Sequence, residues 1–137
     1  MSSDNLDVIR QGYGAFGRGD INALLELFDE QINWVTPGPP ELATSGRRTG
    51  RQEVAEFFAS VNKVFDIQRF QPKEFIAQGD RVVVLGDETA GVRATGKLLE
   101  LDWVHVFTLR DGKVVAFQEF FDTAAVVAAM SAVHAAA

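Results

Sequence analysis

The chain has 137 residues, which is enough for one domain with a substantial core and too few for two. Apolar residues make up 47% of the sequence, so a disordered or fibrous chain is excluded, and the absence of cysteine excludes disulfides and thiolate chemistry. The formal net charge of −6 argues against nucleic acid and anionic membrane surfaces as partners, because both favour basic patches.

The first part of the chain predicts two helices, separated by a break that begins near Gly17. Asp20 can cap the second helix, which we expect over residues 21–30. The first helix has apolar side chains at helical spacing, namely Leu6, Ile9, Tyr13 and Phe16.

A short strand, a loop and a third helix follow. Residues 32–36 predict the strand, and three prolines keep residues 37–48 out of regular structure. Thr49 and Gln52 fit a capping box for a helix over residues 51–65.

From Phe70 to Phe121 the pattern indicates only strands, with turn signals at residues 79–80, 95–96 and 111–112. Helices followed by antiparallel strands predict an α+β fold, with three N-terminal helices packed on a curved, mostly antiparallel sheet. We expect one domain over residues 1–137 with an ordered core from about 4 to 130.

One face of the last hairpin brings polar and aromatic side chains together. Asp111-Gly112 fits either a two-residue loop or a type I turn in which Gly112 forms a bulge. We favour the bulge, which collects the odd-numbered residues on one face, whereas the two-residue loop would set the aromatics against even-numbered residues of the last strand. The collected residues are Trp103, His105, Phe107, Val115, Phe117, Glu119 and Phe121.

The preceding strand adds a second acidic residue to that face. A two-residue turn at Thr95-Gly96 sets Glu88 opposite Trp103, and the bulged hairpin sets Trp103 opposite Glu119. His105 is then diagonal to both acids, with Gly86 opposite it and leaving space beside the imidazole. Two acids and an imidazole on a concave apolar surface are typical of a small-molecule site.

The opposite face of the predicted sheet is also apolar. Its members are Val83, Leu85, Val104, Val106, Val114, Ala116 and Phe120. A monomer would leave this patch in contact with water, so we expect a homodimer that pairs through the outer sheet face.

The start of the chain lacks the basic and apolar regions of a secretory signal, and no apolar run reaches membrane-spanning length. We therefore expect a soluble, cytoplasmic protein with no membrane partner. Its partner is expected to be a small apolar molecule or another protein chain.

Three segments together resemble the nuclear transport factor 2-like superfamily, which includes ketosteroid isomerases, SnoaL-like polyketide cyclases and limonene epoxide hydrolases. They are the early helix that ends in GD before a second helix, the strand HVFTLRDGKV and the closing FQEFFD. The resemblance covers nearly the whole chain and implies a cone-shaped, cystatin-like fold with a pocket. It also implies roles for two residues, because SnoaL-like cyclases carry a pocket histidine at the position of His105 and, at the position of Glu119, the aspartate regarded as their base.

Two other mechanisms of the superfamily do not match this sequence. Thr36 stands at the position of the proton-shuttling aspartate of ketosteroid isomerases, and His105 at that of their protonated aspartate. Gly12 falls where their oxyanion-hole tyrosine would be, with Tyr13 one position away. Trp103 and His105 stand where the epoxide hydrolases carry an Arg-x-Asp pair.

These observations predict a cofactor-independent isomerase, cyclase or lyase that acts on a hydrophobic carbonyl compound. Glu119 would move a proton next to the carbonyl, and His105 would stabilise the enolate or orient Glu119. The alternative is a non-catalytic binding module for an apolar metabolite. We expect no cofactor and no metal. The expected substrate-binding residues are Tyr13, Trp34, Thr36, Phe58, Glu88, Trp103, Phe107, Phe117 and Phe121.

Overall fold

The computed structural model describes residues 2–131, so that Met1 and residues 132–137 lie outside the described part of the chain. The helices are α1 (Ser2–Gly17), α2 (Ile21–Glu26), α3 (Arg51–Val64) and α4 (Thr123–Met130). The strands are β1 (Phe28–Thr36), β2 (Gly46–Thr49), β3 (Phe65–Gln78), β4 (Arg81–Val92), β5 (Leu98–Arg110) and β6 (Lys113–Phe121).

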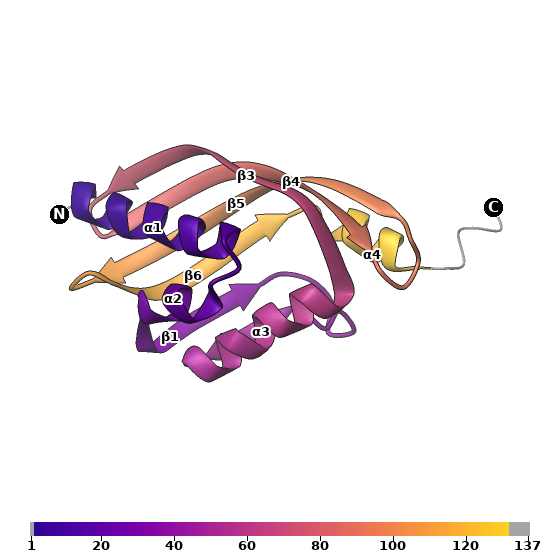
Figure 1. The fold of residues 1–137 in the computed structure, drawn as a ribbon, viewed down its shortest axis with the longest axis horizontal. Helices are drawn as coiled ribbons and strands as arrows, with labels where there is room; N and C mark the ends of the chain where they lie inside the picture. Colours follow the sequence, from indigo (N-terminus) through magenta and orange to yellow (C-terminus); the bar gives the residue numbers. More distant parts are fainter. Residues whose placement is uncertain (1, 132–137) are drawn as a thin grey trace.

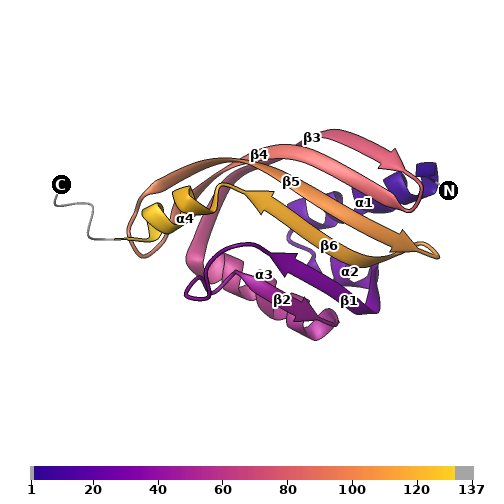
Figure 2. The same cartoon turned by 180° about the vertical axis from the view of Figure 1, so that it is seen from behind.

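The strands form one curved sheet in the order β2-β1-β6-β5-β4-β3. Neighbouring strands are antiparallel except β1 and β6, which run parallel. α1, α2 and α3 cover one face of this sheet, which we call the inner face (Figure 1). The view from behind shows the outer face without a helix over it (Figure 2). The predicted α+β fold is therefore confirmed.

The core lies between α1–α3 and the inner face. Its largest fully buried members include Trp103, Ile32, Leu109 and Val54. A second cluster joins α4 to the far ends of β4 and β5 through Val92, Leu99, Leu101, Val126 and Ala129. No helix among residues 2–131 is both long and apolar enough to cross a membrane.

The second predicted helix is shorter than expected. Asp20 caps it as predicted by accepting a hydrogen bond from the Ala23 backbone N–H at 3.1 Å, but the helix ends at Glu26. Phe28 already belongs to β1, where it pairs with Val114 of β6. The apolar stripe of the helix continues into a strand because this long-range pairing overrides the local pattern.

The segment between β1 and α3 also differs from prediction. Residues 46–48 were expected in a loop and Thr49 as a helix cap, but Gly46–Thr49 forms β2, which pairs with β1. The capping box is wrong, since Gly50 is the N-cap at a φ of 89° and the Glu53 side chain accepts the Thr49 backbone N–H. β3 begins at Phe65, earlier than the predicted start at Phe70.

The favoured turn of the last hairpin, with a bulge at Gly112, is wrong, because Arg110 pairs directly with Lys113 across the two-residue loop that was its alternative. Asp111 and Gly112 form a two-residue loop with φ values of 53° and 78°, both of the left-handed kind that a type I′ turn requires. A bulge lies farther along, because Leu109 pairs with Val114 and Thr108 with Ala116. The extra residue, Val115, switches the parity of β6.

This bulge decides which side chains reach the inner face. From Phe117 onward the odd-numbered residues face inward, as predicted, but Val114 replaces Val115 there and is buried. Val114 was therefore placed on the wrong face. The predicted pairs are also shifted by two residues, since His105 lies opposite Glu119 and Trp103 opposite Phe121.

A shift of two residues also separates the predicted and observed pairing of β4 with β5. Gly86 lies opposite Trp103 rather than His105, and Glu88 opposite Leu101, because the turn between the strands is longer than two residues. An even shift keeps parity, so Glu88 still faces inward. The Trp103 indole fills the space above Gly86, since a Cβ on Gly86 would lie 2.3 Å from Trp103 Cζ2.

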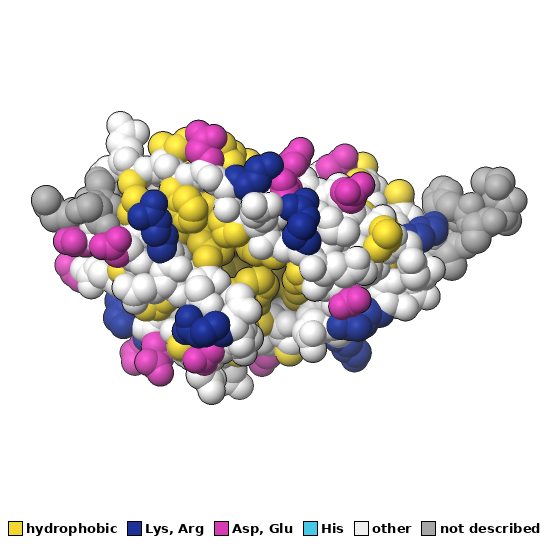
Figure 3. All heavy atoms as spheres, turned by 45° about the horizontal axis from the view of Figure 1, so that its top comes forward, with side chains coloured by type: hydrophobic (Ala, Val, Ile, Leu, Met, Phe, Trp, Pro, Cys, Tyr) yellow, Lys and Arg dark blue, Asp and Glu magenta, His cyan; other side chains and the backbone are white. Residues whose placement is uncertain are grey.

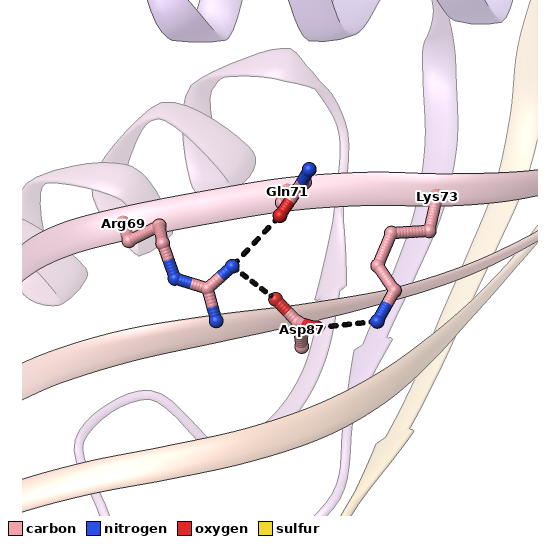
Figure 4. A network of polar contacts seen from close by, with 4 residues as sticks. All are labelled: Arg69, Gln71, Lys73 and Asp87. Atoms are coloured by element: carbon pink, nitrogen blue, oxygen red, sulfur yellow. Dashed lines mark hydrogen bonds and ion pairs between the residues drawn. The ribbon is translucent and has the colours of Figure 1, made fainter.

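The outer face mixes apolar side chains with charged ones. Arg69 and Lys73 of β3 both pair with Asp87 of β4, at 2.8 Å and 2.7 Å, and Arg69 also donates a hydrogen bond to the Gln71 side chain (Figure 4). The hydrogen bond from Lys73 lowers the pKa of Asp87, and the charge of Arg69 adds to the effect. Phe120, on the same face, is 48% exposed.

Candidate functional site

An apolar cavity of about 140 Å³ lies between the helices and the inner face of the sheet. We call it the inner cavity. The surface view shows apolar side chains gathered around a hollow in that face of the molecule (Figure 3). Seven predicted substrate-binding residues contribute aromatic rings or a hydroxyl to its wall, namely Tyr13, Trp34, Thr36, Phe58, Phe107, Phe117 and Phe121. Glu88, His105 and Glu119 also line it.

Tyr13, His105 and Glu119 form a continuous hydrogen-bonded chain. The Tyr13 hydroxyl lies 2.7 Å from His105 Nδ1, and His105 Nε2 lies 3.2 Å from Glu119 Oε2. Burial raises the pKa of Tyr13 above its usual range, and the Glu119 charge adds to this, so Tyr13 keeps its proton and donates to Nδ1. Nε2–H then donates to the Glu119 carboxylate.

Aromatic rings fix the orientation of His105. Trp103 stacks on the imidazole with ring centroids 4.0 Å apart, and Phe117 meets it edge-on at 4.9 Å. Trp103 is itself held by stacking on Phe70 at 4.8 Å and by the notch over Gly86. Trp103 is not among the residues that line the inner cavity, and its stacking supports His105; its contact with substrate stays a prediction.

Glu88 places a second carboxyl group on the wall of the inner cavity. Burial raises the pKa of Glu88 to about 7, and the negative charge of Glu119 adds to the shift. The cavity thus holds two acids in different settings. Glu119 accepts a hydrogen bond from His105, whereas Glu88 is destabilised in its ionised form.

Comparison with known proteins places this architecture in a family. A family model described as a SnoaL-like domain matches residues 9–117. The chain belongs to the SnoaL-like family. The resemblance predicted from the sequence is therefore confirmed.

Solved structures similar to this SnoaL-like chain agree with it over nearly their whole length. An NTF2-like protein from Burkholderia xenovorans LB400 is 34% identical, with a TM-score of 0.87 and coverage of 96% of this chain and 98% of that one. An NTF2-like protein of unknown function from Burkholderia pseudomallei K96243 is 32% identical, with a TM-score of 0.88 and coverage of 96% and 99%. TerC, co-crystallised with polyporic acid, is 35% identical, with a TM-score of 0.83 and coverage of 92% and 97%. A search of curated proteins gave no match.

The wall of the SnoaL-like cavity contains residues that were not predicted to lie there. Leu99 and Leu101 extend the odd-numbered face of β5, so parity could have found them. Phe16 and Phe70 could not be found that way, because they reach the cavity only when α1 and β3 pack around it. Tyr13 was named as a ligand contact, but the sequence held no signal for its bond to His105, which is 92 positions away.

The described part of this SnoaL-like domain, residues 2–131, contains no group of three or more His, Cys, Asp or Glu side chains placed to hold a metal ion. His105, Glu88 and Glu119 all line the inner cavity, but they do not make such a group. Tyr13, His105, Glu88 and Glu119 offer this apolar site hydrogen-bond donors and acceptors and groups that can exchange protons.

Proposed function

We propose that this SnoaL-like domain is a cofactor-independent isomerase, cyclase or lyase that moves a proton on a hydrophobic carbonyl compound. The observation that carries the proposal is the Glu119 carboxylate, which lines an apolar cavity and is held by His105, itself held by Tyr13. A positioned carboxylate in an apolar site is suited to abstract a proton next to a carbonyl group.

Glu119 is the base in this proposal. Its Oε2 accepts the imidazole N–H, which leaves Oε1 for the substrate C–H. The proton moves to Glu119 as the C–H electron pair enters the carbonyl system, and its return to another carbon completes an isomerisation. Because both His105 nitrogens are already bonded within the protein, we assign His105 to positioning Glu119 rather than to stabilising the enolate.

Glu88 is suited to act as the partner acid. A carboxyl with a pKa of about 7 is protonated in a large fraction of molecules at neutral pH and can donate a proton to the substrate. A buried acid that holds its proton close to a second acid is a recurring feature of acid-base sites. The raised pKa follows from burial, so it does not depend on a bound ligand.

The second candidate is a binding module for a small apolar metabolite. The occupied His105 nitrogens and the mainly apolar wall favour it, since neither feature requires turnover. TerC was co-crystallised with polyporic acid, which supports a small organic ligand for this cavity as well. Native mass spectrometry of the purified protein tests the binding reading, which predicts a retained small molecule.

Solvent deuterium exchange separates the two candidates. We expect the wild-type protein to speed deuterium incorporation into an enolisable aryl ketone, such as 4-fluoroacetophenone, in D₂O. Glu119→Gln keeps the shape of the side chain and removes the base, so exchange should fall to the uncatalysed rate. Exchange that survives in Glu119→Gln would exclude Glu119 as the base.

We also propose that the outer face pairs two copies of the chain. Val83, Leu85, Val104 and Val106 lie there on two central strands, and Phe120 beside them is 48% exposed. Burial of this patch against a second copy would remove it from water. The proposal concerns assembly only, because the residues that line the inner cavity belong to the helices and to the other face of the sheet.

A further inference from the structure

Two polar groups on the wall of the inner cavity lack partners. Trp34 is 4% exposed and Thr36 3% exposed, and within residues 2–131 neither Trp34 Nε1 nor Thr36 Oγ1 has a hydrogen-bond partner. Buried donors are nearly always paired, because an unpaired one loses its water without compensation. Both residues line the inner cavity, so a ligand there can supply the missing acceptor.

The sheet places both groups on the same face as Glu119, with Thr36 the nearer of the two. Trp34 and Thr36 are two residues apart on β1, so they face the same side with Cβ atoms roughly 7 Å apart. β1 runs parallel to β6, with Trp34 next to Phe117 and Val35 next to Gln118. Continuing this register by one residue places Thr36 next to Glu119.

We infer that the Trp34 indole N–H and the Thr36 hydroxyl bind the oxygen of the ligand, and that this ligand is a single-ring apolar ketone or its enol. The part of this inference that concerns the reaction rests on the proposed function, whereas the part that concerns binding does not. An indole N–H only donates, so the ligand atom that it meets must accept. A carbonyl oxygen satisfies both groups.

The size of the cavity limits the rest of the ligand. An apolar protein cavity of roughly 150 Å³ holds benzene. The inner cavity, at about 140 Å³, is therefore matched to one ring with a short substituent. The stack of Trp34 on Phe117, with ring centroids 3.8 Å apart, provides a flat aromatic wall.

This placement also explains how the proposed proton transfer is assisted. An oxygen held near Thr36 brings the carbon next to the carbonyl close to Glu119. As Glu119 removes a proton, negative charge moves onto that oxygen and strengthens both hydrogen bonds. The two donors then stabilise the enolate oxygen, a role that His105 does not take because both of its nitrogens are already bonded.

The test compares two ligands of the same shape, 4-fluoroacetophenone and 4-fluoro-α-methylstyrene, which differ by C=O against C=CH₂. Both are titrated by ¹⁹F NMR. We expect the wild-type protein to bind the ketone roughly 3- to 10-fold more tightly than the alkene, as one or two net hydrogen bonds give. Thr36→Val and Trp34→Phe should each lose much of that preference without weakening alkene binding to the same degree.

Two further variants control for folding and packing. Thr36→Ser keeps the hydroxyl and should keep the preference for the ketone. Thr108 of β5 lies on the outer face and does not line the cavity, so Thr108→Val should keep the wild-type ratio.

The inference is overturned if Thr36→Val and Trp34→Phe retain the wild-type ratio of ketone to alkene affinity, or if the wild-type protein shows no preference or binds neither compound. Glu119→Gln separates this result from the proposed function. If deuterium exchange survives in Glu119→Gln while Thr36→Val loses the ketone preference, the proposed base is wrong and the oxygen site stands.

Discussion

Glu88 should make the protein lose stability as the pH rises. Its pKa is raised from 4.5 to about 7 in the folded chain, because burial penalises the ionised carboxylate. A carboxyl with a raised pKa binds protons more readily in the folded than in the unfolded chain. The unfolding free energy therefore falls as the pH rises from 4.5 through 7.

The size of this effect follows from the shift. At 1.36 kcal/mol per pKa unit, the change from 4.5 to about 7 corresponds to about 3 kcal/mol. The penalty is absent below pH 4.5, where Glu88 is protonated in both states, and complete above about pH 8. Glu88→Gln removes the ionisable group but keeps the shape of the neutral acid, so it should be free of this penalty.

The assay is urea unfolding of wild type and Glu88→Gln at several pH values between 4 and 8. The difference in unfolding free energy should grow in favour of Glu88→Gln by about 3 kcal/mol over this range. Glu100→Gln removes a carboxylate from an exposed position of β5 and serves as the matched control, whose curve should run parallel to wild type. A difference between Glu88→Gln and wild type that stays constant with pH would refute the reasoning.

Three more predictions concern packing, the hydrogen-bonded chain and assembly. Gly86→Ala should lower the unfolding free energy by about 1–3 kcal/mol, because its Cβ would meet Trp103 and the Gln71 carbonyl; an unchanged urea midpoint would contradict this packing. Tyr13→Phe should cost about 1–3 kcal/mol by leaving His105 Nδ1 buried without a donor, and imidazole ¹⁵N shifts identical to wild type would show that the bond is absent. The wild-type protein should sediment at micromolar concentration at twice its 15.0 kDa chain mass, and Phe120→Asp as a monomer; a wild-type monomer would exclude the dimer.

The sequence was informative about which face of a strand a residue occupies. His105, Glu119 and Glu88 all reach the inner face as predicted, although both hairpin registers were wrong by two residues. An even shift preserves parity, which explains why these residues still lie on the predicted face. The predicted cross-strand neighbours were wrong, since His105 was expected diagonal to Glu119 but lies directly opposite it.

Features that depend on distant parts of the chain could not be predicted. Phe28 continues the apolar stripe of a helix, and only its pairing with β6 makes it part of a strand. The bulge at Val115 has no local turn signal, yet it decides that Val114 is buried. The bond between Tyr13 and His105 joins a helix to a strand, and no periodicity in either segment indicates it.

The central claim is that Glu119 moves a proton and does not merely hold the ligand. The most direct test measures, for Glu119→Gln and wild type, both the deuterium exchange rate and the dissociation constant of 4-fluoroacetophenone. We expect the exchange rate to fall by roughly 10²- to 10⁴-fold, as loss of a general base does, while the dissociation constant changes little. Equal losses in rate and affinity, or no loss in rate, would contradict the account.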